Sequence, residues 1–297
     1  MSAPTASIVV PTFDRPDRLT ECLEGLCALD ADRHSFEVLV VDDGSTLDLK
    51  PTLQPYRKRL ELQLIRQQNA GPAAARNTGA HHASGDVLAF TDDDCVPDPG
   101  WLSELLRCHQ KHATAIVGGR TINALRDNLF AEASQDLVAY LYDYYAGVSG
   151  SAAFFTSNNM MVGREMFLAL GGFSTRFRLA AGEDRELCDR WLAHGHTLHY
   201  AERAVIRHYH GLDLRRFWRQ HLNYGRGAFH FHTVRRERGG QRTMEPASFY
   251  LQLLLYPLRQ RRPVARAVAG AGLMALSQAA NAAGYFQEKR AAHTRPD

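Results

Sequence analysis

Residues 86–95 read DVLAFTDDDC, a short apolar run that three consecutive aspartates follow at once. The segment 85–90 has the length and the apolar content of a buried strand. Three adjacent carboxylates repel one another, so their position directly after such a strand calls for a partner. A divalent cation would remove the repulsion, because hard cations prefer carboxylate oxygens. A turn or a helix cap is the alternative, since Asp is common in both.

Further strands and helices alternate around this run. Strands are expected at 7–10, 36–41 and 60–66, with helices at 17–29 and 69–82. This alternation predicts a parallel, doubly wound sheet, and runs that are apolar on both faces support it. Open sheets of this class bind ligands at the carboxyl ends of their strands, which is where the acidic residues lie. Neither GxGxxG nor GxxxxGK[ST] occurs, so neither a dinucleotide-binding fold nor a P-loop is supported.

After about residue 115 the alternation is less regular. Strands are expected at 116–119, 158–162 and 199–208, and helices at 183–194 and 214–232. An aromatic-rich helix or loop is expected at 128–145, and the tail from residue 246 reads as helical, broken by Pro257 and Pro263.

The composition is that of an ordinary globular protein. The chain has 297 residues, of which 45% are hydrophobic and 23% are charged. The net charge of +3 gives no reason to expect a nucleic-acid partner. Acidic residues cluster before about residue 105, whereas residues 203–266 are rich in Arg and His. This asymmetry suits an acidic metal site that faces a basic surface.

The cysteines and the first residues indicate the compartment. Five cysteines without a CxxC pair favour neither a zinc site nor a disulfide framework, so a reducing compartment is expected. The N-terminal sequence MSAPTASIVVPTF lacks the basic region and the long apolar run of a signal peptide. We therefore expect a cytoplasmic protein.

The order and spacing of short motifs resemble glycosyltransferase family 2, the inverting enzymes with a GT-A fold. The resemblance covers roughly residues 5–232 and rests on motifs that are weak singly but specific in combination. It implies an α/β fold with a Rossmann-like, mixed, mainly parallel sheet flanked by helices, and a C-terminal helical extension. The matching segments are IVVPTFDRP, VLVVDDGS, NAGPAAARNTG, DVLAFTDDDC, SNNMMV, GGF, GEDREL, HYHG and RRFWRQHLNYGRG.

The resemblance also implies a division of the chain. Residues 1–232 would form the glycosyltransferase domain, with a nucleotide-binding half at about 1–115 and an acceptor-binding half at about 116–232. Residues 233–297 would form the helical extension.

The family's donor site would lie at the ends of the first strands and bind a nucleotide-diphosphate sugar, with UDP as the expected nucleotide. Asp43 would hydrogen-bond a uracil-like base, Arg76 would reach the base or the diphosphate, and Asp92 would bind the ribose. Asp93 occupies a variable position of the family, where its charge could assist the donor site. The base pocket would be lined by Pro11, Thr12 and Phe13.

A metal ion would join this site. The resemblance makes Asp94 the ligand of Mg²⁺ or Mn²⁺, and His208 a later ligand of the metal or the diphosphate. A cation in that place bridges a diphosphate and neutralises charge on the leaving nucleotide.

The proton chemistry would come from a separate motif. An inverting transfer needs one base that takes the proton of the acceptor hydroxyl, and the family places it at the residue that is Asp184 here. Glu183 would orient the acceptor or the sugar. The alternative is an acidic first turn of a helix. At the acceptor side, Asn158 and Asn159 resemble a loop of the family and Trp101 would flank the sugar, with ordinary core packing as the alternative.

The tail raises the question of a membrane. Residues 264–286 carry one charge, Arg266, and approach the length of a membrane span. They are rich in Ala and Gly and include several polar residues, so their transfer into lipid is unfavourable. We expect a helix that packs on the domain or mediates a homodimer, or a peripheral contact with anionic lipid at the inner face of the membrane.

The sequence therefore favours an inverting, metal-assisted glycosyltransferase of the hexosyltransferase type. Its acceptor would be a saccharide, a lipid-linked molecule or a natural product. One alternative is a phosphohydrolase with Asp92 as nucleophile, because the strand and DDDCV loosely resemble the haloacid-dehalogenase motif. Against it, the triplet follows the fourth strand and lysines are scarce downstream. Another alternative is an inactive scaffold that binds sugar nucleotides.

Overall fold

The computed structural model describes residues 5–149, 153–177, 179, 181–240 and 245–294. The chain divides into two compact units. The first comprises residues 1–122, 151–178 and 184–209, and the second comprises residues 123–150, 179–183 and 210–297.

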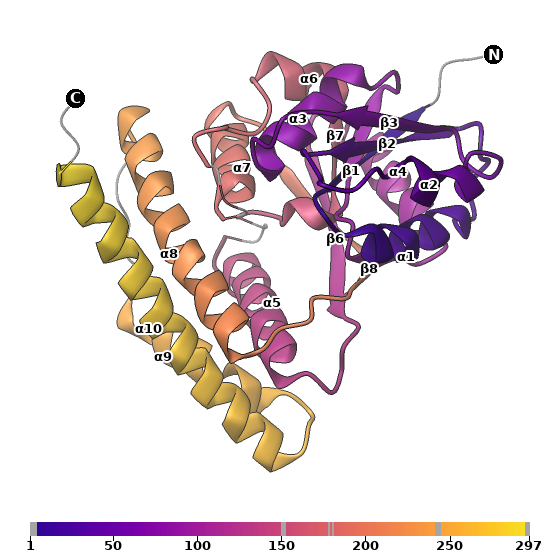
Figure 1. Ribbon diagram of the computed structural model, residues 1–297. Helices are drawn as coiled ribbons and strands as arrows, with labels where there is room; N and C mark the ends of the chain where they lie inside the picture. Colours follow the sequence, from indigo (N-terminus) through magenta and orange to yellow (C-terminus); the bar gives the residue numbers. More distant parts are fainter. Residues whose placement is uncertain (1–4, 150–152, 178, 180, 241–244, 295–297) are drawn as a thin grey trace. The chain divides into compact units, whose positions relative to one another are not determined.

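The first unit contains the sheet and the helices that flank it (Figure 1). Its strands are β1 (Ala6–Thr12), β2 (Phe36–Asp42), β3 (Leu62–Arg66), β4 (Val87–Phe90), β5 (Cys95–Pro97), β6 (Ile116–Asn123), β7 (Met160–Gly163) and β8 (Leu198–His208). Its helices are α1 (Pro16–Cys27), α2 (Lys50–Leu53), α3 (Pro72–His82), α4 (Trp101–Lys111), α6 (Arg164–Ala169) and α7 (Glu183–Ala193), and two 3₁₀ turns lie at Gln54–Tyr56 and Ser157–Asn159.

The described strands form one mixed sheet in the order β3-β2-β1-β4-β7-β6-β8-β5. The strands from β3 to β4 run parallel, as the alternation of strands and helices predicts. After them β7 runs antiparallel to both β4 and β6, and β5 runs antiparallel to β8. The expected mixed sheet flanked by helices is therefore confirmed.

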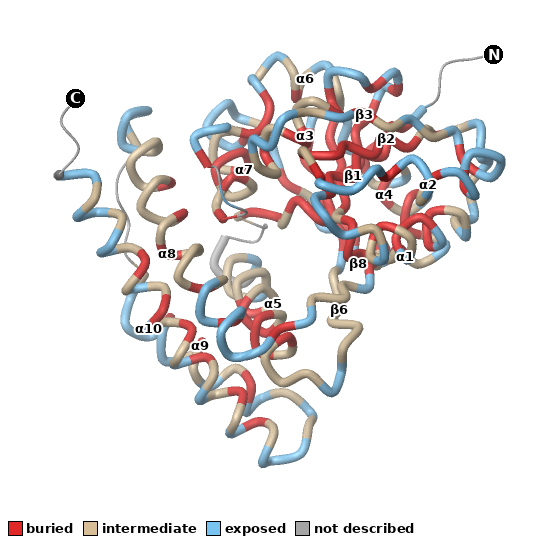
Figure 2. Tube along the Cα trace, viewed as in Figure 1, coloured by how far each residue is buried: buried red, intermediate tan, exposed pale blue. Residues whose placement is uncertain are grey.

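Helices cover both faces of this sheet. Successive side chains of a strand point to opposite faces, and on one face Ile8 and Val10 join a buried cluster with Leu23 of α1 and Trp101 of α4. On the other face α3 lies close to β1, since a Cβ on Gly79 would meet Val9 Cγ1 at 2.4 Å. Figure 2 shows the central strands as buried. Strands covered on both sides explain the continuous apolar runs of the sequence.

The second unit is helical. It contains α5 (Leu129–Ser149), α8 (Leu214–Glu237), α9 (Ala247–Arg259) and α10 (Val264–Thr294). Helices α8 and α10 lie in close contact, because a Cβ on Gly225 or on Gly284 would come within 1.9 Å of a carbonyl oxygen of the other helix. Arg262 pairs with Asp136 of α5 through two hydrogen bonds of 2.9 Å. The segment predicted as a helix or a loop is thus the helix α5.

One expectation about the C-terminal part needs revision. Pro257 was expected to break the tail, but it lies inside α9, two residues before the helix ends. A proline removes one backbone donor, and near the end of a helix this loss affects little of the hydrogen-bond ladder. None of the helices in the described residues combines the length and hydropathy that a membrane span requires.

The two units are defined by compactness, and the predicted domain boundary at residue 232 stays a prediction. The helix α5 groups with the C-terminal helices because Leu137 and Tyr140 are buried in one cluster with Phe249, Leu253 and Met274. The sheet unit accordingly ends at residue 209. The assignment of donor-binding and acceptor-binding halves stays a prediction.

Two glycines of β6 lie where no side chain fits. A Cβ on Gly118 would lie 2.0 Å from Cγ of the buried Phe155, and a Cβ on Gly119 would lie 2.3 Å from Oδ1 of Asn159. The residues that precede β7 therefore pack directly on the backbone of β6. This close packing fixes the segment that carries Asn158 and Asn159 against the sheet.

We expect Gly118→Ala to destabilise the protein by about 1–3 kcal/mol, because the added methyl group overpacks the contact with Phe155. The measurement is the midpoint of urea unfolding. A matched control is Gly163→Ala at the end of β7, where the nearest atom to an added Cβ lies at 3.7 Å. That control should stay within about 0.5 kcal/mol of the wild type. Equal midpoints for both variants would contradict the packing described here.

Candidate active site

The carboxyl ends of β1, β2 and β4 meet at one edge of the sheet. In the β1–β2 register Thr12 lies opposite Asp42, and β4 ends at Phe90, two residues before the acidic triplet. Thr12 Oγ1 donates a hydrogen bond of 2.7 Å to Asp93 Oδ2, although the two residues are 81 positions apart. The sheet therefore places the first strand's loop against the triplet, as the parallel topology predicts.

The three aspartates of the triplet have different surroundings. Asp92 is partly exposed and pairs with Arg76, whose Nη2 donates to Asp92 Oδ1 at 2.6 Å. Asp93 and Asp94 are only 2% and 7% exposed. Burial raises the pKa of Asp93 to about 7, and the guanidinium of Arg15 opposes this shift. Two adjacent buried carboxylates of this kind need positive charge nearby.

Arg15 supplies part of that charge, a role that the sequence does not predict. Its Nη1 lies 2.9 Å from Asp94 Oδ2 and 3.1 Å from Asp93 Oδ1. Burial works against the charged guanidinium, but Asp93 and Asp94 outweigh it, so the pKa of Arg15 is raised. In the sequence this arginine is part of the DRP motif after the first strand, and no pattern connects that motif with the triplet.

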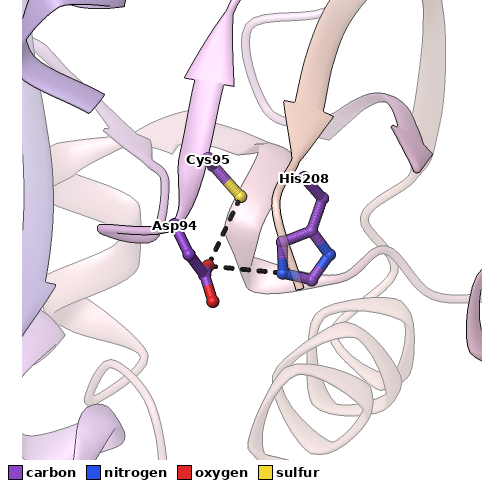
Figure 3. Close-up of side chains that lie close together, drawn as sticks. All are labelled: Asp94, Cys95 and His208. Carbon is purple, nitrogen blue, oxygen red and sulfur yellow. Dashed lines mark hydrogen bonds and ion pairs between the residues drawn. The ribbon is translucent and has the colours of Figure 1, made fainter. Parts of the chain in front are cut away.

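His208 reaches Asp94 from the neighbouring strand. Cys95 of β5 pairs with His208 of β8, and the backbone N–H of Tyr209 donates to the carbonyl of Asp94 at 2.8 Å. His208 Nε2 lies 3.3 Å from Asp94 Oδ1 (Figure 3). Burial lowers the pKa of His208, but the Asp94 carboxylate outweighs it and the pKa is raised. The predicted pair of metal ligands therefore does come together.

This arrangement fits a divalent cation. One ligand atom each of Asp94, Cys95 and His208 lie within 4.8 Å of one another. Two neighbouring ligands of an octahedral cation at about 2.1 Å lie about 3 Å apart, close to the 3.3 Å between Asp94 and His208. Burial raises the pKa of the Cys95 thiol well above its ordinary value. A protonated, soft sulfur does not suit Mg²⁺ or Mn²⁺, so Asp94 and His208 are the residues that fit.

Asp43 organises the loop before α3. Its Oδ1 accepts hydrogen bonds from Gln67 Nε2 at 2.7 Å and from the N–H of Ala70 at 2.9 Å, and its Oδ2 accepts from the N–H of Gly71 at 2.9 Å. Gly71 has a φ of 90°, a conformation that glycine adopts without strain. The carboxylate thus fixes the start of the helix that carries Arg76. Its predicted contact with the base stays a prediction.

Arg76 connects the triplet with Asp184. The side chain of Arg76 is buried, its guanidinium lies 5.6 Å from the centre of the Phe173 ring, and it bonds Asp92. Burial raises the pKa of Asp184, whereas backbone hydrogen bonds from Arg185 and Ser157 and the charge of Arg76 oppose the rise. One arginine therefore acts electrostatically on both the predicted donor site and the predicted base.

Asn77 and Arg190 hold residues 172 and 173 in place. Asn77 of α3 exchanges two hydrogen bonds of 2.8 Å with the backbone of Phe173. Glu186 of α7 is buried and pairs with Arg190, which also donates to the carbonyl of Gly172 at 2.6 Å. These contacts fix Phe173 beneath Arg76. Glu183 is buried and belongs to the second unit, and its predicted role stays a prediction.

The predicted acceptor residues lie in the core of the first unit. Trp101 is fully buried, and its indole Nε1 donates to Asn159 Oδ1 at 2.8 Å. Asn159 Nδ2 donates in turn to the carbonyl of Ala204. The buried Asn158 accepts from Thr156 Oγ1 at 2.8 Å. These contacts are those of ordinary core packing, which was the alternative for these residues. A contact of these residues with an acceptor stays a prediction.

The first loop forms the open side of the site. Pro11 is buried at the end of β1, whereas Phe13 is 44% exposed. Asp14 has a φ of 52°, and its Oδ1 accepts from both the backbone N–H and Oγ1 of Thr46. A residue other than glycine keeps this conformation only when its surroundings hold it. The loop that carries Phe13 and Arg15 is therefore fixed to the loop that follows β2.

The model of the family "Glycosyl transferase family 2" matches residues 7–178. Glycosyltransferase AglE of Haloferax volcanii is 26% identical over 211 residues, which cover 68% of this chain and 66% of that protein. Pre-mycofactocin glycosyltransferase of Mycobacterium tuberculosis is 29% identical over 209 residues, or 69% of this chain and 44% of that protein. Validoxylamine A glucosyltransferase of Streptomyces hygroscopicus is 35% identical over 116 residues, or 38% of this chain and 28% of that protein. The chain thus spans less than two thirds of the length of these relatives.

Solved structures show the same fold. Mannosyltransferase PcManGT of Pyrobaculum calidifontis, solved with GDP-Man and Mn²⁺, has a TM-score of 0.62 at 19% identity, covering 99% of this chain and 82% of that chain. TarS 1-349 of S. aureus, solved with UDP-GlcNAc, has a TM-score of 0.57 at 16% identity, covering 99% and 94%. The fold is the GT-A fold of these glycosyltransferases. Because the family model also matches more than half of the sequence, the chain belongs to glycosyl transferase family 2.

Proposed function

We propose that this protein is a glycosyltransferase that moves a sugar from a nucleotide-diphosphate sugar to an acceptor hydroxyl, with inversion at the anomeric carbon. The observation that supports it most is the position of Arg76, which pairs with Asp92 at 2.6 Å and acts on the charge of Asp184. Donor binding and proton transfer are the two tasks of such an enzyme, and this arginine links the residues predicted for both.

The donor is a nucleoside diphosphate sugar in this proposal. TarS was solved with UDP-GlcNAc and PcManGT with GDP-Man, so both bases occur on this fold. We propose UDP, with Asp43 and the exposed Phe13 at the base and Asp92 at the ribose. Pro11 and Thr12 would complete the base pocket.

Asp94 and His208 would hold Mg²⁺ or Mn²⁺. PcManGT was solved with Mn²⁺, and the Asp94–His208 spacing of 3.3 Å fits two ligands of one cation. When bound, such a cation neutralises the charge that develops on the departing diphosphate. In this proposal Asp93 adds to the negative charge that attracts the cation, and Thr12 holds the Asp93 carboxylate in place.

Asp184 would be the general base. Its carboxylate takes the proton of the acceptor hydroxyl while that oxygen attacks the anomeric carbon, and the bond from this carbon to the diphosphate breaks on the opposite face. Attack and departure on opposite faces give inversion. Burial raises the pKa of Asp184, which strengthens a carboxylate as a base. Glu183 would orient the acceptor or the sugar.

The acceptor and the cellular place are also proposals. The helix α9 buries Phe249 and Leu253 on one side. On its other side it exposes the apolar side chains of Leu251, Leu255 and Leu258. The exposed arginines Arg259 and Arg261 lie next to them in the sequence. Apolar residues next to arginines suit the surface of an anionic membrane. This supports a cytoplasmic enzyme with peripheral membrane contact and a lipid-linked acceptor, while a homodimer through these helices is the competing proposal.

The phosphohydrolase alternative has less support. It requires Asp92 as a nucleophile, whereas Asp92 is the ion-pair partner of Arg76, and the family of the chain consists of transferases. Release of phosphate from a phosphomonoester that depends on Asp92 would restore that alternative.

We expect nucleotide-diphosphate sugars to raise the melting temperature only in the presence of Mn²⁺ or Mg²⁺. A ligand at 100 times its Kd stabilises the folded state by about 2.7 kcal/mol, which shifts the melting temperature by several degrees. Asp94→Asn should abolish this shift, because it removes the charged metal ligand. The control is Asp98→Asn, four residues on, whose carboxylate pairs with Arg207 at 2.7 Å. An equal shift in the presence of EDTA would refute the metal role.

We expect Asp184→Asn to lower the rate of sugar transfer by about 10²–10⁴-fold, because the amide cannot accept the proton. Binding of the donor should persist, and the thermal shift measures it separately. Asp189→Asn, on the same helix, serves as the control and should retain transfer. Transfer at the wild-type rate by Asp184→Asn would remove the assigned base. Donor binding by the wild type, without transfer to any acceptor, would favour the inactive scaffold.

A further inference from the structure

The guanidinium of Arg15 lies on the two carboxylates that are most buried in the triplet. One nitrogen, Nη1, contacts Asp94 Oδ2 at 2.9 Å and Asp93 Oδ1 at 3.1 Å. The partners are almost inaccessible, but the Arg15 side chain itself is 53% exposed. The positive charge therefore reaches a buried acidic pair from the solvent side, where a ligand would also enter.

The backbone around Arg15 is fixed while its side chain has room to move. Asp14 is held by Thr46 and by a hydrogen bond of 2.9 Å from its own N–H to Ser45 Oγ. Arg15 then occupies the N-cap position of α1, whose first residue is Pro16. The backbone thus fixes the position of the Arg15 Cβ, whereas the exposed guanidinium at the end of the side chain can turn toward another anion.

A bound cation and Arg15 in its present position compete for the charge of Asp94. Asp94 is the residue that fits a divalent cation together with His208, and its second oxygen is the one that Arg15 contacts. A guanidinium beside a divalent cation is repelled, and the repulsion is strong where water is scarce. Arg15 must therefore leave Asp94, at least in part, when the cation binds.

We propose that Arg15 is a positioning residue that exchanges partners: it neutralises Asp93 and Asp94 in the cation-free protein, and moves to the diphosphate of the nucleotide when the cation takes Asp94. This inference rests on the proposed metal site. A diphosphate is the fitting new partner, because the planar fork of arginine matches phosphate oxygens through two hydrogen bonds.

The exchange couples two binding events. A cation that binds alone displaces Arg15 and gives it no new partner, so Arg15 opposes that binding. A cation that arrives with a nucleoside diphosphate gives the guanidinium an anion, so Arg15 favours that binding. The cation and the nucleotide therefore strengthen each other's affinity through this one side chain. A merely structural ion pair would weaken both binding events, or neither, when it is removed.

The test is Mn²⁺ binding to the full chain by electron paramagnetic resonance, first alone and then with saturating UDP or GDP. We expect Arg15→Gln to bind Mn²⁺ alone at least about fivefold more tightly than the wild type does. We expect the same variant to bind the Mn²⁺–nucleotide complex at least about fivefold more weakly. Typical coupling between two binding sites changes affinity by about this factor or more. Arg15→Lys keeps the charge without the fork and should fall between the two. Melting temperatures without ligand verify that each variant folds.

Arg207→Gln is the matched control. It removes an equally half-exposed arginine next to His208, but its guanidinium bonds Asp98 at 2.7 Å and 3.1 Å instead of the triplet. It should leave the coupling between Mn²⁺ and the nucleotide unchanged. If the wild type binds Mn²⁺ and Arg15→Gln binds it with the same affinity, the proposed exchange is wrong, whereas the proposed metal site stands. Absence of Mn²⁺ binding by the wild type, even with nucleotide, overturns the metal role and the exchange with it.

Discussion

Repulsion between buried carboxylates at one edge of the sheet is the constraint on which this site depends. Asp93 and Asp94 are adjacent and nearly inaccessible, and burial raises the pKa of Asp93 to about 7. Carboxylates of this kind remain charged only beside cations. Arg15 contacts one carboxylate oxygen of Asp94 and His208 contacts the other, and Arg76 pairs with Asp92. The carboxylates of Asp93 and Asp94 are thus neutralised in part by Arg15, whose side chain is exposed, and this leaves Asp94 accessible to a competing metal ion.

The pairing of Arg76 with Asp92 depends in turn on contacts between distant parts of the chain. Arg76 reaches Asp92 only if α3 starts at the right place, and Asp43 ensures this through three hydrogen bonds to residues 67–71. Phe173 lies beneath the guanidinium because Asn77 holds its backbone. Asp184 follows on α7, where the charge of Arg76 acts on it. Proposed donor binding and proton transfer thus share one supporting framework.

Much of the fold and part of the site could be predicted from the sequence. Apolar runs and their spacing identified the strands other than β5, because a strand that is covered on both faces needs a continuous apolar sequence. The three residues of β5 are too few to form such a run. Parallel order then placed Thr12, Asp43 and the triplet at one edge. The grouping of α5 with the C-terminal helices was not predicted, since it arises from side-chain packing that local patterns do not reveal.

The sequence by itself determined the parallel core, the acidic edge and the pairing of Asp94 with a late histidine that the family resemblance implied. These features follow from local periodicity and from motifs of fixed order. Only the tertiary structure decided that Arg15 neutralises Asp93 and Asp94, that Trp101 bonds Asn159 within the core, and that Arg76 pairs with Asp92 while its charge opposes the rise that burial causes in the pKa of Asp184. Each of these depends on the burial and orientation of side chains far apart in the chain, and such long-range contacts leave no periodic signal in the sequence.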